Sequence, residues 1–209
     1  MKNTLLIYLL LLYCLSAQAY KNRNLLQKQA DPNKLESILL TDKAWIHYPL
    51  YADRHGWDSL TSTNKAYCIQ SGEKYLNYDW KVVKATDYLE YARSGNRSKM
   101  ENIYNSNLNA ISALFIAEMA EGKGRFIDQL ANGVFHTCEM TSWTISAHLS
   151  LQLVQGSFPK LNDHVIDLVS GDVGAMFSWI YYFLNEEFDK LNPLISSRLH
   201  DEIESRILT

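Results

Sequence analysis

Apolar residues recur along most of this chain at spacings of three and four, the period of an amphipathic α-helix. The clearest run follows Ser98, where apolar positions continue at helical spacing to about Glu121 and predict one long helix. Sustained period-two alternation, the mark of a half-buried strand, is absent. The pattern therefore predicts an all-α protein.

Helix start and stop signals give the approximate bounds of the other elements. Asp31 and Pro32 open a short helix over 34–40, and a short helix within 80–93 ends at Ser94-Gly95-Asn96. The segment 20–30 reads as a loose polar leader, and 45–57 as an irregular aromatic-rich segment. A helix is expected from Asp58 or Ser59 to about Tyr78, and another over 123–153 with a break near Gly133. Two more are expected over 165–184, after an Asp163 cap, and from Pro193 to about Ile207. Because no linker interrupts these helices, residues 20–209 are expected to form one domain.

The first 19 residues have the pattern of a cleaved export signal. Lys2 provides the positive end, an apolar run extends from Leu5 to Leu15, and Ala17-Gln18-Ala19 is an A-x-A cleavage site. The run is too short to cross a bilayer as a helix. We therefore expect a periplasmic or secreted protein, cleaved after Ala19 and not held in a membrane.

Composition and charge narrow the functional classes. The net charge of −3 over 209 residues argues against a nucleic-acid partner, since phosphates need a basic face. The 13 Tyr, 5 Trp and 7 Phe suit a protein that holds ring-shaped polar ligands, and equally a helical core.

Cysteine usage gives no support for a metal or cofactor. Signal cleavage leaves Cys68 and Cys138, which an oxidising compartment would allow to pair. Two cysteines inside predicted helices are more often independent buried residues, and both interpretations stay open. There is no Cys-x-x-Cys pair and no Cys/His cluster, so neither a zinc site nor a cofactor is predicted.

Three residues of the predicted 123–153 helix are candidates for binding a sugar. At about 100° per residue, His136, Glu139 and Trp143 lie within one third of a turn. A carboxylate can accept hydroxyl hydrogen bonds, and an indole can stack on the apolar face of a pyranose. The same spacing also fits an ordinary core Trp and an intrahelical His–Glu pair, so periodicity leaves both interpretations open.

Three sequence blocks, in order, resemble a known family. The first contains Tyr48-Pro49, Asp53-Arg54 and Trp57, the second runs from Trp80 to Arg97, and the third runs from Glu118 to His148. Together they are similar to the N-terminal helical part of the heparinase II/III-like polysaccharide lyases, in the form found in secreted Bacteroidota proteins. The resemblance spans nearly all of the chain after residue 19.

The resemblance implies an incomplete (α/α) toroid of helical hairpins with a substrate groove at one mouth. The family cleaves uronate-containing polysaccharides by β-elimination, with a Tyr moving protons and an Asn or His neutralising the uronate. These catalytic positions and the family's C-terminal β-sandwich come after the matched region. We therefore expect an N-terminal fragment without catalytic residues, inactive alone, that keeps His136, Glu139 and Trp143 as binding residues for an acidic polysaccharide.

Two other hypotheses stay open beside the lyase fragment. One is a stand-alone helical carbohydrate-binding or scaffolding module, and the other is an (α/α) glycosidase, which would need a second carboxylate opposite Glu139. A partial toroid should also leave an apolar helix face bare and cause self-association, through Phe177, Ile180, Tyr181 and Leu184. Two structural interpretations complete the predictions: a buried Asp53–Arg54 pair, and His148 at a helix end or in the core.

Overall fold

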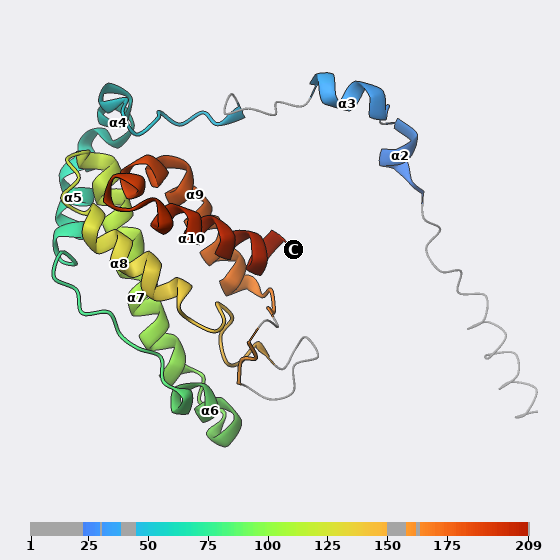
Figure 1. Ribbon diagram of the computed structural model, residues 1–209, viewed down its shortest axis with the longest axis vertical. Helices are drawn as coiled ribbons and strands as arrows, with labels where there is room; N and C mark the ends of the chain where they lie inside the picture. The colour runs from blue at the N-terminus through green and yellow to red at the C-terminus, as the bar shows by residue number, and fades with distance from the viewer. Residues whose placement is uncertain (1–22, 30, 39–44, 150–157, 162–163, 209) are drawn as a thin grey trace, which may run out of the picture. The chain divides into compact units, whose positions relative to one another are not determined.

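The computed structural model describes residues 23–29, 31–38, 45–149, 158–161 and 164–208 (Figure 1). The chain divides into two units, residues 1–47 and 48–209. In the first unit the described helices are α2 (Leu25–Gln29) and α3 (Pro32–Ile38). Helix α3 begins at the predicted Pro32, and α2 lies in the segment expected to be a loose leader. The Ala19 cleavage site is outside the described residues.

The second unit is a bundle of helices with short connections. Its elements are α4 (Arg54–Thr61), a 3₁₀ turn (Ser62–Asn64), α5 (Lys65–Glu73), α6 (Ala85–Ser94), α7 (Ser98–Glu121), α8 (Ile127–Cys138), α9 (Leu168–Leu191), α10 (Pro193–Ile203) and a terminal π turn (Glu204–Leu208). Within the described ranges every regular element is a helix, which confirms the all-α prediction.

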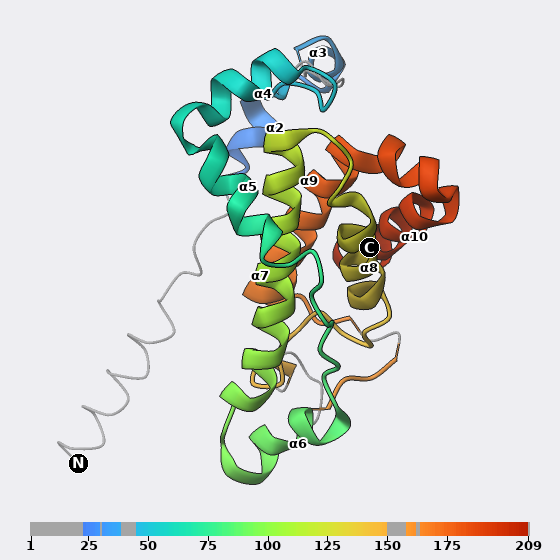
Figure 2. The ribbon, with the colours of Figure 1, turned by 90° about the vertical axis from the view of Figure 1, so that its left-hand side faces the viewer.

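Helix α7 is the axis of this unit and has the predicted extent, although Arg97 and not Ser98 is its N-cap. Its residues Tyr104, Ile111 and Leu114 are completely buried, because α5, α6, α8 and α9 all pack against it. Figures 1 and 2 both place α4 at one end of α7 and α6 at the other. Helix α5 approaches α7 closely at Gly72, where an added Cβ would lie 2.3 Å from the Cβ of Ala117. Only glycine permits that approach.

Two helices end at a glycine, and the first of these ends is the one predicted at Ser94-Gly95-Asn96. Gly95 ends α6 with φ 75°, and Gly122 ends α7 with φ 66°, both in the left-handed region that glycine favours. Pro193 likewise begins α10, where the side chain of the N-cap Asn192 accepts the amide of Leu194 at 2.9 Å.

The helix expected over 123–153 is much shorter than predicted. Helix α8 ends at Cys138, and the residues that follow alternate Ser or Thr with larger side chains. Their hydroxyls bond to the backbone instead: Ser142 Oγ accepts the amide of Thr144 at 3.0 Å, and Thr144 donates to the carbonyl of Val165. Such local hydroxyl bonds compete with helix continuation. The long-helix prediction was wrong for this reason.

Two further bounds also differ from the predictions. The helix expected from Asp58 or Ser59 to Tyr78 is divided by the 3₁₀ turn at 62–64, where Ser62 has φ 43°. Helix α9 begins at Leu168, after an Asp167 cap whose carboxylate accepts the amide of Ser170 at 2.7 Å. Asp163, the predicted cap, is outside the described residues.

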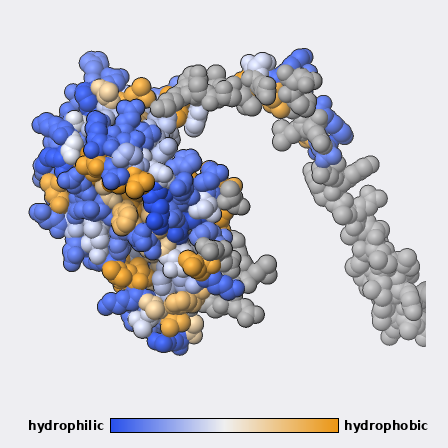
Figure 3. All heavy atoms as spheres, in the orientation of Figure 1, coloured by the Kyte–Doolittle hydropathy of each residue, from blue (hydrophilic) through white to orange (hydrophobic). Residues whose placement is uncertain are grey.

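The predicted bare apolar face is closed. Phe177, Ile180 and Leu184 are fully buried, and Tyr181 is partly covered, since α9 packs against α7, α8 and α10. The prediction that these residues form an open surface was therefore wrong. Figure 3 shows a mainly hydrophilic face with separate small hydrophobic areas.

Candidate functional site

A groove runs beside α8, between that helix and the junction of α9 with α10. We call it the α8 groove; its volume is about 680 Å³. A second hollow of about 290 Å³ adjoins it, and His136 and Glu139 line both. The α8 groove is lined by Trp80, Ala131, Asn132, Phe135, His136, Glu139, Asn192, Leu194 and Ile195. Two of the three predicted binding residues thus lie together at the boundary between the hollows.

Aromatic and apolar side chains form much of the groove wall. The Trp80 ring lies against α8 at Gly133, where an added Cβ would be 2.2 Å from the far edge of the indole. Its ring is stacked with His136 at a centroid distance of 6.2 Å and an interplanar angle of 27°. Phe135 is 53% exposed, so a large part of its ring is available to a ligand. This lining suits a molecule with both apolar faces and polar edges.

His136 is held from behind by a buried amide. Asn107 on α7 is 1% exposed, and its Nδ2 lies 3.3 Å from Nε2 of His136. The same amide bonds the backbone of Lys81 in both directions and accepts the hydroxyl of Tyr78 at 3.1 Å. The segment carrying Trp80 is thereby fixed across α7 and α8.

Glu139 starts a chain of alternating charges that leads from the groove into the core. Its carboxylate is 53% exposed and lies 3.2 Å from Arg198, whose Nε lies 2.6 Å from Glu202. Glu202 also pairs with the buried Arg206. Both guanidinium groups donate to the carbonyl of Cys138 at 3.2 Å, which places two cations at the C-terminal end of α8.

Trp143, the third predicted binding residue, is in the core. It is 2% exposed, and its Nε1 donates to the carbonyl of Thr137 at 3.0 Å. Phe177 meets its ring edge-on at 5.2 Å, and the guanidinium of Arg206 lies 5.1 Å from the ring centroid. No ring face is left for a sugar. The prediction that Trp143 shares a helix stripe with Glu139 was wrong because α8 has already ended.

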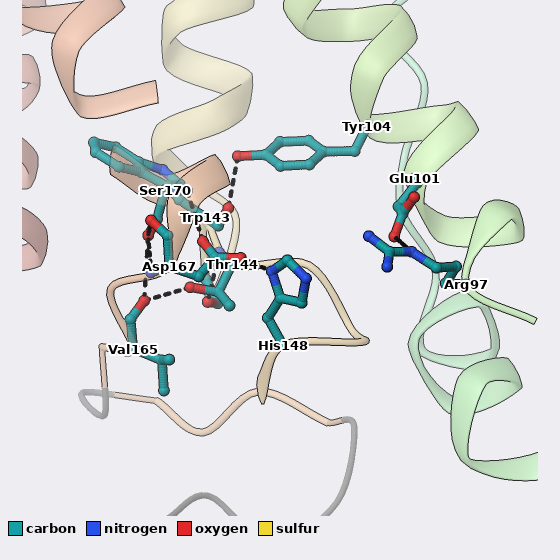
Figure 4. A network of polar contacts seen from close by, with 10 residues as sticks. Arg97, Glu101, Tyr104, Trp143, Thr144, His148, Val165, Asp167 and Ser170 are labelled. Atoms are coloured by element: carbon teal, nitrogen blue, oxygen red, sulfur yellow. Dashed lines mark hydrogen bonds and ion pairs between the residues drawn. The ribbon is translucent and has the colours of Figure 1, made fainter. Parts of the chain in front are cut away.

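His148 belongs to a cap, shown in Figure 4. Its Nδ1 is 2.5 Å from the carboxylate of Asp167, which also accepts the amide of Ser170. Asp167 stands between the serine and the histidine, whereas a hydrolase triad needs the imidazole in that place. The Ser170 hydroxyl donates to backbone carbonyls, at 3.1 Å to Asp167 itself. This cluster starts α9. His148 does not lie at the end of the helix predicted to carry it, because α8 ends at Cys138; it instead supports the N-cap of α9 through Asp167.

Asp53 and Arg54 act separately instead of forming the predicted pair. Asp53 caps α4 by accepting the amide of Gly56 at 2.9 Å. Arg54 donates to the carbonyls of Tyr51, at 2.7 Å, and of Met119. The prediction of a direct pair was wrong because each side chain is engaged by backbone groups.

The described residues offer little support for other site chemistries. They contain no group of three or more His, Cys, Asp or Glu side chains able to hold a metal ion. Cys68 and Cys138 are both free thiols, and burial raises the pKa of Cys138 to about 12. Across the helices that the structure describes, none has the length and apolar character to span a bilayer.

Asn107 and Phe135 are not among the residues predicted from the sequence, and Trp80 belongs there only to a block similar to the family. Both Asn107 and Phe135 follow helical spacing like their neighbours, so only the packing of α7 against α8 gives them a role.

Comparison with known proteins adds no further constraint. No protein-family model matches the chain, and no curated protein matches it in sequence.

Proposed function

We propose that residues 48–209 are the sugar-binding helical part of an exported heparinase II/III-like polysaccharide lyase, and that the α8 groove holds part of a uronate-containing polysaccharide. The observation that carries the proposal is the groove itself, which places an exposed aromatic ring beside an imidazole, a carboxylate and two amide side chains. The three sequence blocks similar to the family support it independently.

The lining chemistry matches a sugar ring. A pyranose presents C–H groups on its faces and hydroxyls around its edge, and the hydroxyls both donate and accept hydrogen bonds. Phe135 offers an apolar face, while Asn132, His136, Glu139 and Asn192 offer polar groups around it. Under this proposal the consecutive packed pairs α7–α8 and α9–α10 are hairpins of an incomplete (α/α) toroid.

Calorimetric titration with uronate oligosaccharides tests the binding role. We expect Phe135→Ala and Glu139→Gln each to weaken binding about tenfold, or about 1.4 kcal/mol. Tyr67→Ala and Glu186→Gln are matched controls, because both side chains are exposed and neither lines the groove. Absence of binding, or equal losses in groove and control variants, would contradict the proposal.

Catalysis is assigned to none of these side chains. We expect the purified chain not to release unsaturated uronates from an acidic glycan, and their appearance would overturn the assignment of a binding role alone.

A stand-alone binding or scaffolding module is the second candidate. The burial of Phe177, Ile180 and Leu184 favours it, because α9 does not need a further domain to cover those side chains. A cooperative melt of the isolated chain that shifts upward with added oligosaccharide supports this candidate. The glycosidase hypothesis gains less, since Glu139 is the one carboxylate among the described residues that line the two hollows.

A further inference from the structure

The orientation of the Asn107 amide is fixed by its neighbours. The amide of Lys81 donates to Asn107 Oδ1 at 3.1 Å, and Asn107 Nδ2 donates to the carbonyl of Lys81 at 2.7 Å. A backbone N–H can only donate and a carbonyl can only accept, so turning the side-chain amide over would break both bonds. The nitrogen of Asn107 therefore has to face His136.

That orientation selects the protonation of the imidazole. The second hydrogen of Asn107 Nδ2 is directed toward His136 Nε2, 3.3 Å away. A hydrogen bond forms only if Nε2 carries a lone pair, and a neutral imidazole with a bare Nε2 carries its proton on Nδ1. The other tautomer would set two donors against each other at a buried amide.

The Nδ1–H group is then available to a ligand. His136 lines both hollows. Its ring bonds to Asn107 through Nε2, and Nδ1 is not buried away from solvent without a partner. Glu139, the C-cap residue of α8, has a 53% exposed side chain that can only accept hydrogen bonds while ionised. One donor and one acceptor therefore stand next to each other at the boundary between the hollows.

We propose that Asn107 is a positioning residue, which holds His136 as the Nδ1–H tautomer so that His136 and Glu139 bind two neighbouring hydroxyls of a sugar ring. The inference rests on the proposed sugar-binding function and names the part of the sugar that is held here. Arg198, the guanidinium beside Glu139, is already shared by Glu139, Glu202 and the carbonyl of the last residue of α8. A uronate carboxylate here would therefore meet the charge of Glu139 without gaining a cation of its own, so the hydroxyl edge is the matching group.

Nitrogen NMR of the free protein tests the tautomer directly. In a ¹⁵N-labelled chain at about pH 8, the His136 ring signals are assigned by their loss in His136→Gln. We expect Nε2 to resonate as an unprotonated nitrogen and Nδ1 as a protonated one, with the Nδ1–H form favoured at least about tenfold. A protonated Nε2 in the wild-type chain overturns the proposal without recourse to any variant.

Two Asn107 variants separate positioning from simple support. Asn107→Asp replaces the donor with an acceptor and should reverse the tautomer to Nε2–H, whereas Asn107→Leu should remove the preference. Asn109→Leu, an exposed asparagine on the same helix, is the control and should leave the spectrum unchanged. An unchanged His136 tautomer in folded Asn107→Asp overturns the positioning role.

The ligand part is tested with oligogalacturonate and its methyl ester, which has the same hydroxyls and no charge. We expect both probes to shift the His136 ring signals and their affinities to agree within about threefold, while loss of one hydrogen bond in Asn107→Leu weakens both about fivefold. Binding that leaves the His136 signals unshifted, or an affinity that falls more than about tenfold when the carboxylates are esterified, overturns the proposal that His136 and Glu139 bind hydroxyls. Neither result overturns the proposed function. Absence of binding by both probes contradicts the proposed function and the hydroxyl assignment, while the tautomer is still judged on the free protein.

Discussion

The buried side chain of Glu118 gives the sharpest stability prediction. Glu118 is completely buried at the C-terminal end of α7 and accepts three hydrogen bonds. One oxygen accepts the hydroxyl of Tyr51 at 2.6 Å and the amide of Gly124 at 2.8 Å, and the other accepts the amide of Phe126 at 3.2 Å. The carboxylate thus ties together α7, the turn that follows it and the segment before α4.

The magnitude follows from which partner each substitution leaves unpaired. In Glu118→Gln the amide oxygen can keep Tyr51 and Gly124, but its NH₂ group then faces the buried amide of Phe126. One unpaired buried N–H costs about 1–3 kcal/mol, so we expect a loss of about 2 kcal/mol. Glu118→Ala loses all three bonds and leaves a void. Tyr51 and Gly124 can turn to water, so the expected loss is about 4 kcal/mol.

Urea unfolding followed by tryptophan fluorescence measures both losses. Glu186→Gln makes the same chemical change on the exposed surface of α9 and should stay within about 0.5 kcal/mol of wild type. A Glu118→Gln loss below about 0.5 kcal/mol, or equal losses for the glutamine and alanine variants, would refute this account of the three acceptor bonds.

Three more predictions concern buried groups. Burial raises the pKa of Tyr88 from 10.0 to about 12, so its contribution to stability is complete below pH 10 and is lost as pH rises from there toward 12. Urea melts across that range should show a steeper fall for wild type than for Tyr88→Phe, and parallel curves would exclude the effect. Burial likewise raises the pKa of Cys138 from 9.0 to about 12. In the Cys68→Ser variant, where Cys138 is the remaining thiol of the described residues, its reaction with a disulfide reagent at about pH 8 should be roughly a thousandfold slower than that of an exposed thiol. Equal rates would contradict the burial of Cys138. Trp143→Ala should cost about 4 kcal/mol in a urea melt, whereas folded Trp143→Phe should keep sugar affinity within about threefold of wild type. A selective loss of sugar binding in Trp143→Phe would return Trp143 to the groove.

The sequence predicted helices well where caps and periodicity agreed. Helix α7 has clear apolar spacing and a closing Gly122, and both bounds were correct. The helix after it failed, because periodicity continues past Cys138 while the hydroxyls of Ser142 and Thr144 favour other backbone bonds. Spacing alone cannot weigh those two tendencies.

The same limit explains the mixed outcome for the groove. His136 lies within α8 and Glu139 is its C-cap, so the two side chains lie on the same side of the helix as predicted. The prediction for Trp143 assumed that the helix continues past Cys138, which it does not. Asn107 could not be predicted, because its role depends on Lys81 and His136, which are 26 and 29 residues away along the chain. Side-chain register between packed helices is not contained in the period of either helix.

The chain of charges from Glu139 to Arg206 has a consequence for redesign of this protein. Glu139, Arg198, Glu202 and Arg206 sum to zero, and each inner member serves two partners. Reversing the sign of the rim residue alone would place two cations side by side and weaken the support beneath the Cys138 carbonyl. A change of charge at the groove therefore has to be made together with a compensating change in its partners, so that positive and negative side chains still alternate. Ligand preference and the stability of the last turn of α8 are in this way linked.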